Sequence, residues 1–132
     1  MQVDVVSPEK LLFSSEAVSV EIPGSDGDMT AMANHAPLIT TLRPGILRVV
    51  QEKDTSEYVV TGGFAELGET VSVLAEKAVL KADFDREIYE ELVTAAQTAL
   101  DAARASTVGD AVDMAAKSLS DFNTLGENLG FK

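Results

Sequence analysis

Residues 1–82 alternate short apolar runs with turn-forming residues, which is the pattern of a protein built from strands. In one run, Val18, Val20 and Ile22 alternate with polar residues, so these three are expected to share the buried face of a strand. Many short strands separated by Gly, Pro, Ser and Asp predict an antiparallel β-sandwich or barrel. The expected strands are Gln2–Val6, Glu16–Ile22, Asp28–Met32, Ile46–Val50, Tyr58–Thr61, Phe64–Leu67, Val71–Leu74 and Ala78–Lys81.

After residue 82 the apolar residues recur at the three- and four-residue steps of helices. We expect Asp83 to cap the first helix, because its carboxylate can accept hydrogen bonds from free backbone amides. A second helix is expected from about Asp110 until Gly126 and Gly130 end it. The fold class is therefore β plus α: an antiparallel β-sandwich over residues 1–82, then an antiparallel two-helix hairpin over residues 83–132. The expected inward positions are Ile88, Leu92, Ala95, Ala96, Ala99 and Ala103, and then Val112, Ala115, Ala116, Leu119, Phe122 and Leu125.

Alanine dominates the expected contact between the two helices. Because alanine buries little apolar area, this contact contributes only modestly to stability. Two interpretations remain open. The hairpin is either a fixed appendage, or a mobile element that rests on the β-domain or on a partner and is released at low cost.

Composition narrows the class of protein. The chain has 132 residues, 45% of them hydrophobic, no cysteine and a net charge of −12. This charge disfavours nucleic-acid binding and peripheral binding to anionic lipid. The absence of cysteine excludes disulfides, a thiol nucleophile and cysteine-ligated zinc. No signal peptide and no apolar run long enough to span a membrane are expected.

Residues with catalytic or metal-binding chemistry are scarce. His35 is the only histidine, so we interpret it as a structural hydrogen-bonding residue rather than a catalyst or metal ligand. Asp26 and Asp28 flank Gly27 but lack the later ligands of a calcium loop, so they are interpreted as turn residues. We therefore expect no catalytic residues, no metal and no cofactor.

Several short motifs occur together in an order that is more specific than any one of them. On these motifs the chain resembles the ε subunit of bacterial F-type ATP synthases, the homologue of the mitochondrial δ subunit. The resemblance covers residues 1 to about 85 closely, and the remainder only in length and type. The motifs are Val5–Glu9 with Phe13, Gly24–Asp28, His35–Leu38, Leu42–Gly45, Gly62–Phe64 and Val71–Glu76.

The resemblance implies a sandwich of about ten strands, a helical hairpin and a non-catalytic role in the central stalk. It implies that the β-domain binds the γ subunit and the c-ring, and couples proton-driven rotation to ATP synthesis in the α/β head. It implies a place at the cytoplasmic face of a bacterial inner membrane, or at the matrix or stromal side in an organelle. The residues it assigns to partner contact are Asp26, Asp28, Met32, His35, Pro37, Leu38 and Thr40.

The resemblance also implies two functions of the hairpin. In many members the hairpin extends towards the α/β head and inhibits ATP hydrolysis through basic residues of its second helix. Here Lys117 and Lys132 are the only cations from Asp110 onward, so this electrostatic route is expected to be weak. Some members bind ATP through an Ile/Leu-Asp-x-x-Arg-Ala motif. Leu100–Ala105 fits it, making Asp101 and Arg104 candidate ligands, but it lies too late in the helix and is interpreted as coincidence.

Three functional hypotheses follow from these observations. The first is the rotor subunit, and the second is a dedicated nucleotide-sensing regulator of the ATPase. The third is a free-standing all-β binding module.

Overall fold

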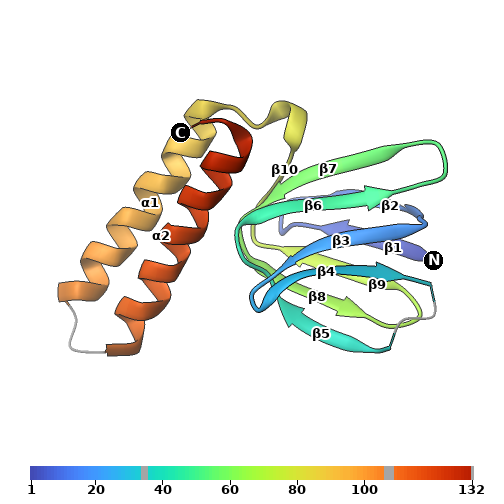
Figure 1. Cartoon of the computed structure of the whole chain (residues 1–132), viewed down its shortest axis with the longest axis horizontal. Helices are drawn as coiled ribbons and strands as arrows, with labels where there is room; N and C mark the ends of the chain where they lie inside the picture. Colours follow the sequence, from blue (N-terminus) through green and yellow to red (C-terminus); the bar gives the residue numbers. More distant parts are fainter. Residues whose placement is uncertain (34–35, 106–108, 132) are drawn as a thin grey trace. The chain divides into compact units, whose positions relative to one another are not determined.

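The computed structural model describes residues 1–33, 36–105 and 109–131. The chain forms two compact units, Met1–Asp83 and Phe84–Lys132, and each is described by itself (Figure 1). A short 3₁₀ turn at Lys81–Asp83 ends the first unit.

The first unit is a β-sandwich in which the described residues form two five-stranded sheets. Sheet A has the strand order β2-β1-β9-β8-β5, and sheet B has the order β10-β7-β6-β3-β4. Every pairing is antiparallel except that of β1 with β9. The expected sandwich is therefore confirmed. The strands are β1 (Gln2–Val6), β2 (Leu11–Glu16), β3 (Ser19–Gly24), β4 (Gly27–Met32), β5 (Leu38–Thr41), β6 (Gly45–Val50), β7 (Thr55–Val60), β8 (Gly63–Leu67), β9 (Val71–Ala75) and β10 (Ala78–Leu80).

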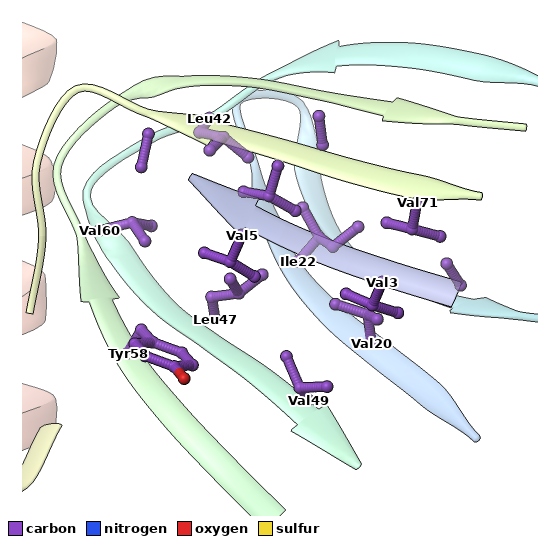
Figure 2. Close-up of a cluster of buried hydrophobic side chains, with 14 of the residues drawn as sticks. Val3, Val5, Val20, Ile22, Leu42, Leu47, Val49, Tyr58, Val60 and Val71 are labelled. Carbon is purple, nitrogen blue, oxygen red and sulfur yellow. The ribbon is translucent and has the colours of Figure 1, made fainter. Parts of the chain in front are cut away.

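The core of this unit lies between the two sheets. Side chains from β1, β3 and β6 point into one shared space, as Figure 2 shows. Val5, Val20 and Leu47 are each 0% exposed. Complete burial of such a side chain contributes about 1.5–3 kcal/mol, so this layer holds the sheets together.

Two strands and one inward position differ from the sequence prediction. The strands β2 and β5 were not expected, because both carry mostly exposed side chains and show no alternation of buried and exposed residues. Val18 was expected to face inward but is 51% exposed. It lies in a bend before β3, where its amide donates to the carbonyl of Val50 at 2.7 Å, so the inward alternation begins only with Val20.

The second unit is a helical hairpin of α1 (Arg86–Ala105) and α2 (Gly109–Leu129). The cap of α1 is Asp85 rather than the expected Asp83, because Asp85 Oδ1 accepts from the amide of Ile88 at 2.9 Å. Asp83 instead belongs to the preceding 3₁₀ turn and lies two residues before Asp85.

The contact face of α1 also differs from the prediction. Tyr89 and Leu100 are buried together with the expected Ala96 and Ala103, whereas Ala95 and Ala99 are exposed. Ile88 and Leu92 are half-buried. Alanines spaced around a helix do not define one stripe, so the bulky side chains decide which face is buried. On α2, Phe122 and Leu125 are buried as expected, Val112, Ala115 and Leu119 are half-buried, and Ala116 is exposed.

The end of α2 is built around one glycine, not two. Gly130 has φ +79°, the left-handed conformation that ends many helices. The amide of Gly130 donates to Glu127 at 3.2 Å, and the amide of Phe131 donates to Gly126 at 2.8 Å, which together form a Schellman cap. Gly126 was expected to help end α2, but it lies inside the helix and is buried.

Candidate functional site

The residues expected to contact partners lie mostly along one edge of the β-sandwich. The strand β4 is the edge strand of sheet B, and β5, the next strand in the chain, is the edge strand of sheet A (Figure 1). A bridge between Gly24 and Leu42 joins the two sheets on this side. We call Gly24–Met32 together with Pro37–Arg43 the β4–β5 edge.

Large apolar side chains are exposed on the β4–β5 edge. Met32 is 58% exposed, Leu38 46% and Ile39 68%. Pro37 is also exposed, and Thr40 is half-buried. Three large exposed apolar side chains on two edge strands make this edge a candidate protein-binding surface.

His35 lies outside the described residues. The structure therefore says nothing of its position, and its assigned contact stays a prediction.

The turn between β3 and β4 requires glycine on both sides. Gly27 has φ +137°, a conformation that other residues rarely adopt. A Cβ on Gly24 would lie 2.7 Å from the carbonyl oxygen of Gly27, closer than van der Waals contact allows. These two glycines thus allow a tight turn between β3 and β4. Asp26 lies at the tip of this turn and is exposed.

Hydrogen bonds tie this turn in sheet B to β5 in sheet A. The amide of Ser25 donates to the carbonyl of Thr41 at 2.9 Å, and Thr41 Oγ1 donates to Ser25 Oγ at 2.8 Å. The amide of Arg43 donates to the carbonyl of Pro23 at 3.0 Å. The turn is therefore anchored to both layers of the sandwich.

Asp28 has a charged partner within the chain. Arg43 Nη2 forms an ion pair with Asp28 Oδ1, and Arg43 Nη1 donates to the carbonyl of Gly24 at 2.6 Å. The side chain of Arg43 is 27% exposed, whereas that of Asp28 is 76% exposed. Arg43 was not among the residues predicted to contact partners. A signal was present, because it is the only Lys or Arg between Lys10 and Arg48 and it accompanies an acidic turn.

A second apolar surface crosses the outer face of sheet A. Strand register aligns side chains from all five strands in one row, which we call the sheet A row. Leu11 is 59% exposed, Phe64 43% and Leu74 39%. None of these residues was predicted as a contact, because their alignment depends on strand order, which the sequence does not reveal. The members of the row are Thr41, Phe64, Leu74, Val6 and Leu11.

The candidate nucleotide ligands lie on the exposed surface of α1. Asp101 accepts from Gln97 Nε2 at 3.0 Å, a local contact one turn away, and Arg104 is exposed. A cavity of about 360 Å³ in the same unit is lined by other residues, among them Arg86, Tyr89 and Phe131. That cavity and the two candidate ligands are therefore separate features. In α2, Lys117 pairs with Asp121 at 2.9 Å.

The described residues contain no group of three His, Asp or Glu side chains placed to hold a metal ion. In the same part of the chain, no helix is long and apolar enough to cross a membrane.

The fold defines a class of protein: a ten-stranded β-sandwich, in the described residues, followed by a two-helix hairpin. Residues 1–81 match the family described as the β-sandwich domain of the ATP synthase delta/epsilon chain. The chain belongs to this family, which confirms the resemblance of its motifs. Its expected role as a non-catalytic subunit of ATP synthase is confirmed with it.

Two bacterial relatives match over nearly their whole length. The ATP synthase epsilon chain of Fuscovulum blasticum is 52% identical over 132 residues, covering 99% of this chain and 97% of the relative. That of Rhodobacter capsulatus is 48% identical over 130 residues, covering 98% and 96%.

Two solved structures share the fold. The Euglena gracilis mitochondrial ATP synthase, solved with OSCP, F1 and c-ring, contains a chain with TM-score 0.71 and 23% identity, covering 96% of this chain and 79% of that one. The Tetrahymena thermophila mitochondrial central stalk and c-ring contains one with TM-score 0.54 and 14% identity, covering 67% and 68%.

Proposed function

We propose that this chain is a rotor subunit of the ATP synthase central stalk that couples c-ring rotation to ATP synthesis, with the β4–β5 edge docked on the c-ring. The observation that supports this most is the set of exposed apolar side chains, Met32, Leu38 and Ile39, on an edge anchored to both sheets. The solved structures that share the fold come from complexes that include a c-ring.

The anchoring of the β4–β5 edge suits a joint that transmits torque. A flexible loop would lose conformational entropy on docking and would yield under load. The bonds from Ser25 and Arg43 to sheet A and to β3 hold the turn before any partner arrives. Docking therefore requires little further ordering of the turn.

The sheet A row is proposed as the surface for the γ subunit. Phe64, Leu74 and Leu11 expose apolar area across the outer face of sheet A, and their row meets the β4–β5 edge only at Thr41. A rotor subunit that meets both the ring and γ needs two separate contacts, and this is the second apolar surface of the sandwich. We place the assembled subunit at the cytoplasmic face of a bacterial inner membrane, which agrees with its bacterial relatives. The matrix or stromal side of an organelle is the alternative.

A matched pair of substitutions tests the docking edge. Leu38 and Leu80 lie on opposite edge strands and have similar exposure, 46% and 44%. We expect Leu38→Asp to weaken co-purification with the c-ring and to reduce proton-driven ATP synthesis in membrane vesicles. Leu80→Asp should leave both unchanged. Equal effects of the two variants, or none from Leu38→Asp, would overturn the assignment of this edge.

The same co-purification assay tests the sheet A row. Leu74→Glu places a charge in the middle of the row and is expected to reduce recovery of γ. Thr55→Glu places the same charge on the outer face of sheet B, where Thr55 is exposed opposite Val50, and serves as the control outside both proposed surfaces. Retention of γ by Leu74→Glu would contradict this placement.

A further inference from the structure

Arg43 connects two parts of the turn that contains the acidic residues. Its guanidinium donates to the carbonyl of Gly24 at the start of the turn and pairs with the carboxylate of Asp28 after it. The backbone amide of Arg43 donates a hydrogen bond to the carbonyl of Pro23 at 3.0 Å. A planar guanidinium can hold two acceptors at fixed angles, which an ammonium group cannot do.

We propose that Arg43 is a positioning residue that fixes the Gly24–Asp28 turn in its docking shape and neutralises Asp28 before the partner binds. This rests on the proposed docking of the β4–β5 edge. When the β4–β5 edge docks on the c-ring, Asp28 is then already paired with Arg43 of the same chain. It is not free to accept a hydrogen bond from a basic residue of the ring.

The composition of the β4–β5 edge supports this assignment. The other large side chains displayed on the β4–β5 edge, Met32, Leu38 and Ile39, are apolar. A bare carboxylate beside an apolar contact loses hydration without compensation, whereas a paired one keeps a partner. The exposed ion pair by itself adds little to folding stability, so its effect should be seen mainly in docking.

The opposite arrangement makes opposite predictions. If Asp28 instead pairs with a basic residue of the ring, Asp28→Asn must weaken docking, and docking must be strongly salt-dependent. Removing Arg43 would then free Asp28 and leave docking unchanged or stronger.

The test measures binding of the full-length chain to the ATP synthase complex depleted of it, over a range of salt concentrations. We expect Arg43→Met to weaken binding about fivefold, the size of an exposed charge coupling. The double variant Arg43→Met/Asp28→Asn should recover most of this loss, and Asp28→Asn alone should change binding little. Unchanged or tighter binding by Arg43→Met, or no recovery in the double variant, would overturn the proposal.

Arg48→Met is the matched control. Arg48 forms a comparable ion pair with Glu21 at 2.7 Å on the outer face of sheet B, so its loss removes the same charge and a similar bond. Binding should be unaffected, and thermal stability should fall as little as in Arg43→Met. A general loss of folding would appear as lower thermal stability that the second substitution does not restore.

Two further variants complete the test. Arg43→Lys keeps the charge beside Asp28 but cannot hold Gly24 as well, so hydrogen exchange of the Ser25 amide should accelerate while salt dependence stays low. Leu38→Asp separates the two proposals. If it abolishes binding while Arg43→Met does not weaken it, only the role of Arg43 fails. If neither affects binding, the docking edge itself is wrong.

Discussion

Tyr58 and Tyr89 are both buried, but their hydroxyl groups differ in hydrogen bonding. The Tyr58 hydroxyl donates to the carbonyl of Leu12 at 3.3 Å. The Tyr89 hydroxyl has no hydrogen-bond partner among the described residues. A buried polar group without a partner costs about 1–3 kcal/mol, so the two hydroxyls have opposite effects on stability.

We expect the two tyrosine-to-phenylalanine substitutions to change stability in opposite directions. Tyr89→Phe removes an unpaired buried hydroxyl and should stabilise the hairpin by about 1 kcal/mol. Tyr58→Phe removes a hydrogen-bonded one and should destabilise the sandwich by about 1 kcal/mol. Denaturant unfolding followed by circular dichroism measures both. A loss of stability in Tyr89→Phe would show that its hydroxyl is satisfied in solution.

The same tyrosines predict a loss of stability at alkaline pH. Burial raises the pKa of Tyr89 above 10.0, with nearby Glu127 adding to the rise and Arg86 opposing it. Burial also raises the pKa of Tyr58, against an opposing hydrogen bond with Ser56. The folded state therefore holds these protons more tightly than the unfolded state. The contribution of these two tyrosines to the free energy of unfolding is complete at pH values below their pKa in the unfolded chain. It is lost as the pH rises through their higher pKa values in the folded protein. The double Phe variant should show a smaller alkaline decline.

At the scale of the element, α2 depends on a glycine in its interior. A Cβ on Gly126 would overlap the ring and hydroxyl of Tyr89, so the close approach of the two helices requires a residue without a side chain. Phe131, which follows the Schellman cap, packs on Tyr89 at 5.3 Å between ring centroids and on Phe84 at 6.0 Å. These aromatic contacts of the hairpin therefore gather where α1 begins and α2 ends.

Gly126→Ala is expected to destabilise the hairpin, although alanine favours helices by about 1 kcal/mol over glycine. Overpacking against Tyr89 costs about 1–3 kcal/mol and outweighs that gain. In a Tyr89→Leu background the same substitution should become neutral or stabilising, because the ring is gone. Thermal unfolding of the four proteins in this cycle measures the coupling. Additive effects would show that the two residues do not meet.

At this scale the sequence predicted whether a segment is a strand or a helix better than it predicted the residues at which the segment begins and ends. The alternation around Val20 and the helical spacing around Ala96 identified strand and helix correctly. The strand β5 was missed because its apolar residues, Leu38 and Ile39, are adjacent and do not alternate with polar ones. The role of Arg43 also escaped, since its contact with Asp28 joins segments that meet only in the folded sandwich. The order of the motifs was enough to identify the family. Individual contacts between residues could be found only in the folded structure.

At the scale of the whole molecule, each of the two units has buried residues of its own. The core cluster of the sandwich draws all its residues from the first unit. The helices α1 and α2 have buried residues of their own, including Leu100 and Leu125. We propose a division of labour between the units, in which the sandwich docks and the hairpin regulates ATP hydrolysis.

Deleting residues 84–132 is expected to leave the sandwich folded and proton-driven ATP synthesis intact, with a change only in the control of ATP hydrolysis. Vesicles carrying full-length or truncated chain provide the comparison, and circular dichroism checks the fold of the truncated chain. Loss of synthesis with a folded sandwich would reject this division of labour.

The nucleotide-sensing alternative has its own signature. It requires that ATP change the rate of hydrolysis through the hairpin. Asp101→Ala and Arg104→Ala in the full-length chain should then remove that ATP response as completely as the deletion does. We expect these variants to behave like wild type, because both side chains lie on the exposed surface of α1.

The parallel pairing of β1 with β9 affects how the protein folds while the ribosome synthesises it. Val3 of β1 aligns with Val71 of β9. The first strand to be synthesised therefore pairs with β9 only after almost the whole first unit has been synthesised, and sheet A cannot be completed earlier. Contacts so distant along the chain slow folding, because a long loop must be ordered before they form. The nascent sandwich therefore exposes β1 and its apolar residues throughout most of its synthesis. The hairpin, whose helices are neighbours in sequence, can close soon after it emerges.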